Sequence, residues 1–175
     1  RDERTAGVPQ KVAKILNPSE HYATTGIQVM EINTLSQLYS LKGSAQLEAA
    51  EHLLFMPDLF SYFLTGEVSN EYCIATTSEL MDAKRRNWSW ETIKILGLPE
   101  HIFGKIVMPG TIRGTLTKAI SEETGLGAVK VIAVGSHDTA SAVAAVPAVE
   151  GDGTVAFLSS GTWSLLGLEL PEPIL

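Results

Sequence analysis

The first two thirds of the chain carry apolar residues at helical spacing. Leu35, Leu38 and Leu41 recur at three-residue steps, which predicts a helix from a cap at Asn33 to Lys42. Similar patterns, opened by a proline or a serine and in two cases closed by a glycine, predict four further helices. These cover residues 9–16, 45–54, 57–64 and 90–96.

The last third changes character. Residues 129–134 read VKVIAV, a β-branched run typical of a buried strand in the middle of an α/β sheet. The small residues 139–146 predict a helix that Pro147 ends, and residues 154–158 and 162–170 predict two strands with a short turn between them. The fold class is therefore predicted as α/β, although no pattern determines the order of the strands.

Composition excludes several classes of protein. The 175 residues, 45% hydrophobic and 19% charged, suit a globular core of one domain with part of a neighbour. No apolar run approaches the ~20 residues that cross a bilayer, so no membrane partner is expected. The net charge of −7, with one short basic cluster at residues 84–86, argues against a nucleic-acid partner.

The single cysteine and the two ends also carry information. Cys73 cannot form a disulfide within the chain, which indicates a reducing compartment, the cytoplasm. Its sequence neighbours offer no base, so a packed side chain is favoured over a catalytic thiol. The chain starts abruptly at Arg1 and stops abruptly at Leu175, so both ends are expected to be cuts through a longer protein.

Asp138 is the first candidate for chemistry. It follows the predicted strand and opens the predicted helix, where ligands of open α/β sheets bind. A carboxylate at that place could accept a proton from a substrate hydroxyl. From the residues alone, a helix cap at Asp138 and a hydrogen-bonded structural role for His137 are the stronger readings.

Two other groups are weaker candidates. The segment SSGTWS at residues 159–164 could turn its amides toward an anion, although an ordinary hairpin turn is the stronger reading, and no Walker A loop occurs. Polar residues near helix ends could bind a sugar or simply lie on the surface; these are Asp2, Glu3, Arg4, Glu31 and Asn33. The four histidines show no ligand spacing, so no metal site made of protein side chains is predicted.

In order, the motifs resemble the rhamnulokinase branch of the FGGY carbohydrate kinases. The resemblance runs the whole length of the chain, and its two most specific segments are GSHDTASA at residues 135–142 and SSGTWSL at 159–165. The remaining segments are RDERT (1–5), GIQ (26–28), INTLSQL (32–38), FMPDLFSYFLTG (55–66), NEY (70–72) and ATT (75–77).

The resemblance implies an actin-like, ribonuclease H-type fold with two domains. Residues 1–150 would belong to the sugar-binding domain, and residues 151–175 would begin the ATP-binding domain. The reaction would transfer the γ-phosphoryl group of ATP, with Mg²⁺, to the C1 hydroxyl of a ketose, L-rhamnulose. Asp138 would be the proton acceptor, His137 and Thr139 would help to hold the sugar, and Gly161 and Thr162 would contact ATP phosphates.

The chain departs from the family's pattern in what it lacks. The amino-terminal DxGxxxxR-type phosphate loop and the adenine-binding glycines are absent from these 175 residues. The chain by itself is therefore expected to be inactive and to need the rest of a kinase as a partner. The alternatives are an FGGY kinase for xylulose or fuculose, a non-catalytic sugar-binding module of the same fold, and an unrelated α/β binding protein in which Asp138 is only a cap.

Overall fold

A computed structural model describes residues 3–147, 155–161 and 163–175. Thr154 and Thr162, which were predicted to lie in strands and, for Thr162, at the ATP site, lie outside the described residues. The helices are α1 (Val8–Val12), α2 (Pro18–Thr25), α3 (Thr34–Ser40), α4 (Ala45–Glu48), α5 (Met56–Thr65), α6 (Tyr72–Thr76), α7 (Trp90–Ile95), α8 (Lys118–Thr124) and α9 (Asp138–Ala144), with single 3-10 turns at Glu3–Thr5 and Glu100–Ile102.

The described strands pair two by two. β1 (Asn70–Glu71) pairs in parallel with β4 (Ile106–Val107), and β2 (Met81–Asp82) pairs antiparallel with β3 (Asn87–Trp88). β5 (Ile112–Thr115) pairs antiparallel with β6 (Lys130–Ile132), and β7 (Ala156–Ser160) pairs antiparallel with β8 (Ser164–Leu168).

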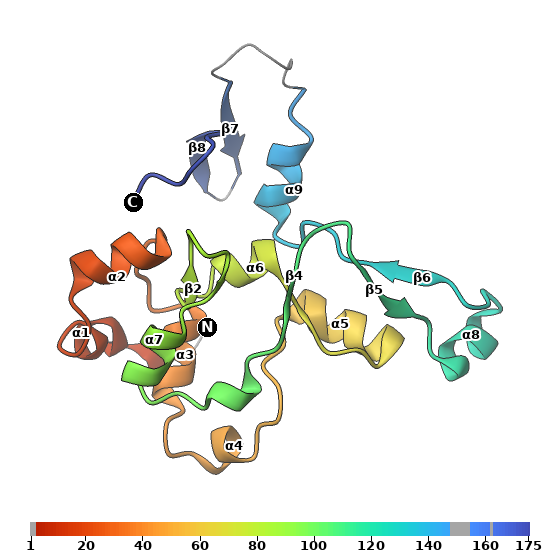
Figure 1. Ribbon diagram of the computed structural model, residues 1–175, viewed down its shortest axis with the longest axis horizontal. Coiled ribbons are helices and arrows are strands. Elements are labelled where there is room, and N and C mark those ends of the chain that lie inside the picture. The colour runs from red at the N-terminus through yellow and green to blue at the C-terminus, as the bar shows by residue number, and fades with distance from the viewer. Residues whose placement is uncertain (1–2, 148–154, 162) are drawn as a thin grey trace.

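The hydrophobic core is built by residues 8–103. Trp88 is at its centre, stacks against Phe55, meets the edge of Phe103 with ring centroids 5.0 Å apart, and donates its indole N–H to the Gly104 carbonyl at 2.7 Å. Around it pack buried apolar side chains from α1, α3, β2, α7 and the residues next to β2 and α7: Val8, Val12, Leu35, Leu38, Leu80, Met81, Ile93 and Leu96. In Figure 1 α5, β5, β6 and α8 extend to one side of this body, and α9 with the β7–β8 hairpin rises from it.

Several helix boundaries were predictable from their caps. Ser44 accepts the N–H of Leu47 at 3.2 Å, as expected of a cap, and Gly66 ends α5 with a left-handed φ of 75°. The helix after Ser44 is nevertheless shorter than predicted and ends at Glu48 rather than Leu54. The reason is tertiary: the Leu53 amide donates to the Ile102 carbonyl at 2.8 Å, and this pairs the segment with a distant part of the chain instead of continuing the helix.

The prediction of a buried strand at residues 129–134 was only partly right. The strand exists as β6. Of residues 129–134, however, Ala133 alone is buried, and Val129, Ile132 and Val134 are about half exposed. Within the described residues β5 is the only strand that pairs with β6. This two-stranded sheet is not buried on both faces as the middle of an α/β sheet would be, so apolar side chains of β6 remain exposed.

The turn near residue 160 also differs from the prediction. Ser159 and Ser160 belong to β7, where Ser160 pairs with Ser164, and the connection begins only at Gly161.

No helix in the described part of the chain is long and apolar enough to span a bilayer.

Candidate functional site

The segment with the predicted sugar-binding residues joins β6 to α9. Asp138 is the first residue of α9, and its side chain is 99% exposed. Its Oδ1 accepts the Thr139 N–H at 2.7 Å and lies 3.4 Å from the Thr139 hydroxyl oxygen. The carboxylate is therefore open to solvent and accessible to a hydroxyl that has to lose a proton.

His137 and Thr139 flank this carboxylate. His137 occupies the N-cap position of α9 without capping it through its side chain, and its Nδ1 lies 3.6 Å from Asp138 Oδ1, too far for a hydrogen bond. The structure thus gathers the three predicted sugar-binding side chains around one exposed oxygen. A helix cap accepts a free N–H of the first helical turn, and Asp138 does accept the Thr139 N–H. It does so from the first helical position, whereas His137 occupies the N-cap position.

A buried carboxylate, Glu71, contacts this segment, and no role for it was predicted from the sequence. Glu71 is fully buried and accepts the N–H groups of Cys73 at 2.7 Å and Ile74 at 3.1 Å, which caps α6. Its Oε2 also accepts the Ser136 hydroxyl at 2.5 Å and the Ser136 N–H at 3.2 Å. One side chain therefore joins the start of α6 to the loop that carries Asp138.

The ionisation of Glu71 follows from these contacts. Burial by itself raises the pKa of this carboxyl, but the hydrogen bonds from Cys73, Ser136 and Ile74 favour the charged form and outweigh it. The pKa of Glu71 therefore lies below its usual value of 4.5. The residue is a carboxylate at neutral pH and holds its donors through charge-assisted hydrogen bonds.

A second buried acid supports Glu71. Asp58 on α5 accepts the Glu71 N–H at 3.0 Å and the Asn70 side-chain amide at 3.2 Å. Its Oδ1 also lies 2.6 Å from Arg113 Nη2 of β5, in an ion pair whose side chains are 0% and 3% exposed. Arg113 donates in addition to Ser69, so a continuous polar network runs from β5 to the loop before Asp138.

Cys73 lies against the same carboxylate. Burial, together with a hydrogen bond to Glu71 and the negative charge of Glu71, raises the pKa of the Cys73 thiol to about 11. Glu71 therefore opposes ionisation of the thiol rather than promoting it, and it is not an activating base. The pKa shift agrees with a packed, unreactive side chain, since the thiolate is the reactive form.

The polar residues near the first helix ends have structural partners. Asn33 is buried and donates its amide to the Gln28 carbonyl and to Glu79, both at 2.9 Å. Glu31 accepts the Gly7 N–H at 2.9 Å. Arg4 and Glu3 lie in the first 3-10 turn, and Asp2 lies outside the described residues.

The predicted ATP-contacting segment lies in the β7–β8 hairpin. α9 contacts β7, and in Figure 1 the chain ascends α9 and returns along β7. The Gly161 N–H donates to the Trp163 carbonyl at 2.9 Å, so this amide already has an acceptor. Apart from its chain neighbours, no described residue has an atom within 4 Å of a Cβ placed at Gly161.

The described residues do not form a metal site by themselves. No group of three or more histidine, cysteine, aspartate or glutamate side chains converges anywhere in the described ranges. Mg²⁺ in kinases is commonly held by one or two carboxylates and by the phosphates of its nucleotide, and Asp138 is one exposed carboxylate. One exposed carboxylate does not by itself define a Mg²⁺ site.

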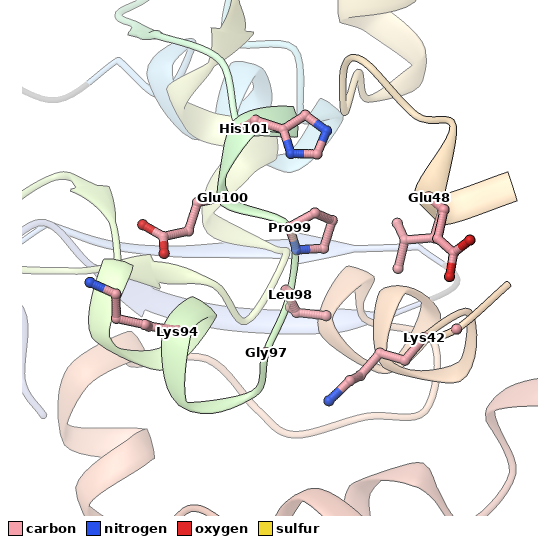
Figure 2. A pocket seen from close by; sticks show the side chains of 10 residues that line it. Lys42, Glu48, Lys94, Gly97, Leu98, Pro99, Glu100 and His101 are labelled. Carbon is pink, nitrogen blue, oxygen red and sulfur yellow. The ribbon is translucent and has the colours of Figure 1, made fainter. Parts of the chain in front are cut away.

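A separate cavity lies away from the segment that carries Asp138. Its volume is about 360 Å³, and it is lined by residues within 42–48, around the start of α4, and within 94–101, around the end of α7. Figure 2 shows these side chains, and none of them belongs to the 135–139 segment. The Lys42 ammonium donates to the Leu96 carbonyl at 2.5 Å, and His101 Nε2 lies 3.0 Å from the Ala50 carbonyl oxygen. These two polar groups therefore serve the fold, and the cavity is not the predicted sugar site.

Comparison with known proteins decides the family. Residues 1–145 match the N-terminal domain of the FGGY family of carbohydrate kinases. The chain belongs to this family. Over its full length it is 49% identical to a rhamnulokinase of Bacteroides thetaiotaomicron, and over 99% of its length it is 40% identical to one of Halalkalibacterium halodurans. It spans 36% and 37% of these two relatives.

Solved structures agree with this FGGY assignment. A carbohydrate kinase from Novosphingobium aromaticivorans superposes on 97% of the chain, and 37% of that kinase is covered, with a TM-score of 0.79 and 28% identity. A xylulose kinase from Lactobacillus acidophilus covers 76% of the chain, which matches 28% of that protein, with a TM-score of 0.68 and 18% identity. The chain thus has part of the actin-like α/β fold, as the resemblance predicted.

Two residues of this candidate site were missed from the sequence. Ser136 and Glu71 lie inside segments that the motifs contain, GSHDT and NEY, but 65 residues separate them. An acid two or three residues before free helix amides is a recognisable cap signal, so the capping role of Glu71 could have been found. Its contact with Ser136 had no signal along the chain.

Proposed function

We propose that this chain is the sugar-binding part of an ATP-dependent kinase that phosphorylates L-rhamnulose at its C1 hydroxyl. The observation that carries the proposal is the 49% identity to a rhamnulokinase over the whole chain, which includes the GSHDT segment. The domain division at residue 150 belongs to the same proposal; the family match ends at residue 145.

In the proposed reaction Asp138 accepts the proton of the attacking hydroxyl. Its exposed carboxylate suits this task, since a positioned base of this kind is typically worth ~10²–10⁴ in rate. His137 and Thr139 would orient the sugar beside it. ATP, as the phosphoryl donor, would be bound by parts of the kinase beyond these residues together with Gly161 and Thr162, and phosphoryl transfer would depend on positioning and charge stabilisation.

The test is a coupled ADP-release assay of the full-length protein that carries this chain. L-Rhamnulose, L-fuculose and D-xylulose are compared as acceptors, with ATP and Mg²⁺. We expect L-rhamnulose to give the highest kcat/KM and Asp138→Asn to lower kcat by about 10²–10⁴ with little change in thermal stability, because the side chain is exposed. Glu122→Gln, an exposed acid on α8, is the matched control.

Each alternative has its own outcome in this assay. A preference for xylulose or fuculose would support the kinase activity and contradict L-rhamnulose as the substrate. Inactivity with every acceptor, with rhamnulose still raising the melting temperature, would indicate a non-catalytic sugar-binding module. Full activity of Asp138→Asn would leave Asp138 as a helix-end residue only. The isolated 175-residue chain is expected to be inactive.

A further inference from the structure

The loop that carries Asp138 has few connections to the rest of the molecule. Between residues 134 and 147, within the described part of the chain, every hydrogen bond to another element goes to Glu71. The other polar contacts are internal: the Ser141 hydroxyl donates to the Gly135 carbonyl, and Asp138 accepts from Thr139. Beyond Ala133, one carboxylate therefore supplies the hydrogen bonds that connect this loop to another described element.

Glu71 is itself held rigidly. Both of its oxygens accept backbone amides at the start of α6, and its own N–H is bound to Asp58, which is paired with Arg113. A side chain with 0% exposure and four donors has no room to change rotamer without leaving donors unsatisfied. It can therefore transmit the position of α5 and β5 to the loop.

The loop is also packed closely on this side. A Cβ at Gly135 would lie 3.3 Å from Ser141 Oγ and 3.8 Å from Cys73 Sγ, so the backbone there approaches α6 and α9 at the same time. Ser136 comes next, with its N–H and hydroxyl on Glu71, and Asp138 follows two residues later. The contact thus fixes the backbone immediately before the proposed base.

We propose that Glu71 is a positioning residue for the proposed kinase reaction: through its two hydrogen bonds to Ser136 it fixes the backbone that places Asp138 against the sugar hydroxyl. This inference rests on the proposed function for its catalytic part. Glu71 touches neither sugar nor ATP in this role and acts only through the loop. A displacement of a reacting group by about 1 Å can cost 10²-fold in rate. The contact between Glu71 and Ser136, which we call the clamp, would therefore affect the rate of the reaction.

The kinetic test uses the full-length protein with Glu71→Gln and Ser136→Ala, alone and combined with Asp138→Asn. Ser136→Ala removes one hydrogen bond at little cost to the fold, and we expect it to lower kcat about tenfold with an unchanged KM for ATP. Glu71→Gln should lower kcat further. In the Asp138→Asn background both changes should have little additional effect, because the base that they position is gone. Ser40→Ala is the control, because the Ser40 hydroxyl donates to the Gln37 carbonyl of its own helix.

Hydrogen exchange separates the clamp from the kinase reaction. In Glu71→Gln and Ser136→Ala, amides of residues 134–141 should exchange about tenfold faster than in the wild type, while amides of α3 and α7 stay unchanged. This measurement tests whether Glu71 holds the loop even if the wild-type protein phosphorylates no sugar. A lack of sugar phosphorylation would reject the proposed function but not the contact between Glu71 and the loop.

The clamp is rejected by any of three results. The first is exchange at residues 134–141 that matches the Ser40→Ala control. The second is kcat within twofold of wild type in both single variants of an active kinase. The third is an equal loss of activity whether or not the protein also carries Asp138→Asn, since a general loss of folded enzyme would act in both backgrounds.

Discussion

Asp138 and Glu71 are two carboxylates with opposite surroundings. Asp138 is 99% exposed and accepts one backbone amide, whereas Glu71 is fully buried and accepts four donors from α6 and Ser136. An accessible acid can receive a proton from a substrate, and a buried, saturated acid can only organise its neighbours. Their environments therefore assign them different tasks within the same small region of the molecule.

The lowered pKa of Glu71 predicts an acid-dependent stability. Because the folded-state pKa lies below the usual 4.5, the carboxylate stabilises the fold fully above about pH 4.5, and this contribution is lost as the pH falls through the folded-state pKa. The difference in free energy of unfolding between wild type and Glu71→Gln should be constant from about pH 7 to 5 and narrow below pH 4.5. Urea unfolding along this pH series measures it; a difference that widens toward acid would contradict the hydrogen-bonded carboxylate.

The raised pKa of Cys73 predicts that its thiol reacts slowly with alkylating reagents. A shift from the usual 9.0 to about 11 lowers the thiolate fraction at pH 7 about a hundredfold. Cys73 should therefore react slowly with iodoacetamide in the folded chain, faster in urea, and faster in folded Glu71→Gln, which lacks the charge that helps to raise the pKa. Mass spectrometry over time follows the reaction, with Glu122→Gln as control. Equal rates in Glu71→Gln and wild type would contradict the contact.

At the scale of elements, the buried ion pair between Asp58 and Arg113 joins α5 to β5. The two groups lie 2.6 Å apart with almost no exposed surface, and Asp58 also binds both residues of β1. Removing one partner of such a pair leaves an uncompensated buried charge.

Asp58→Asn is therefore expected to lower the free energy of unfolding by about 3–5 kcal/mol. Glu122→Gln, which breaks the exposed 3.7 Å pair with Lys118 on α8, should cost no more than about 0.5 kcal/mol. Urea unfolding of the two variants and the wild type, followed by circular dichroism, compares them. Similar small losses in both variants would show that the buried pair does not hold α5 to β5.

The helices show which elements are readable along the chain. α5, α7 and the start of α4 were predicted from the serines, prolines and glycines at their ends. Ser89, the predicted cap of α7, makes no side-chain cap bond, and its hydroxyl lies 2.8 Å from the Thr92 hydroxyl instead. α2 carries an equally clear signal that was overlooked: Asn17 accepts the amides of Ser19 and Glu20, and Pro18 opens the helix. The length of α4 was unreadable, because a contact with the chain near Ile102 ended it.

At the scale of the whole molecule, a broad apolar surface is left open. Met56, Phe60 and Phe63 recur at helical spacing along α5 and are 58–63% exposed, so they share one uncovered face. Ile132 and Val134 are exposed to a similar extent at β6. The chain spans about a third of the length of its FGGY relatives, and surfaces of this kind mark places where other protein packs.

The isolated chain should therefore bind the dye ANS while it is folded and associate as its concentration rises. Phe60→Ser with Phe63→Ser should lower dye binding with little loss of stability, because both side chains are already in water. Ile15→Ser, at a single exposed position near α1, is the control and should change the fluorescence less. Sedimentation and ANS fluorescence measure the effect, and an unchanged signal in the double variant would contradict it.

The sequence by itself determined what depends on neighbouring residues. Prolines, glycines and capping side chains placed most helices, the β-branched run at 129–134 marked a strand, and the GSHDT and SSGTWS segments indicated the family. Tertiary structure decided the rest: that Glu71 binds Ser136 across 65 residues, that Asp58 binds Arg113 across 55, and that β6 lies half open. The physical reason is that a cap is a contact within one turn of the chain, whereas burial and buried polar pairs depend on which distant segments come to pack together.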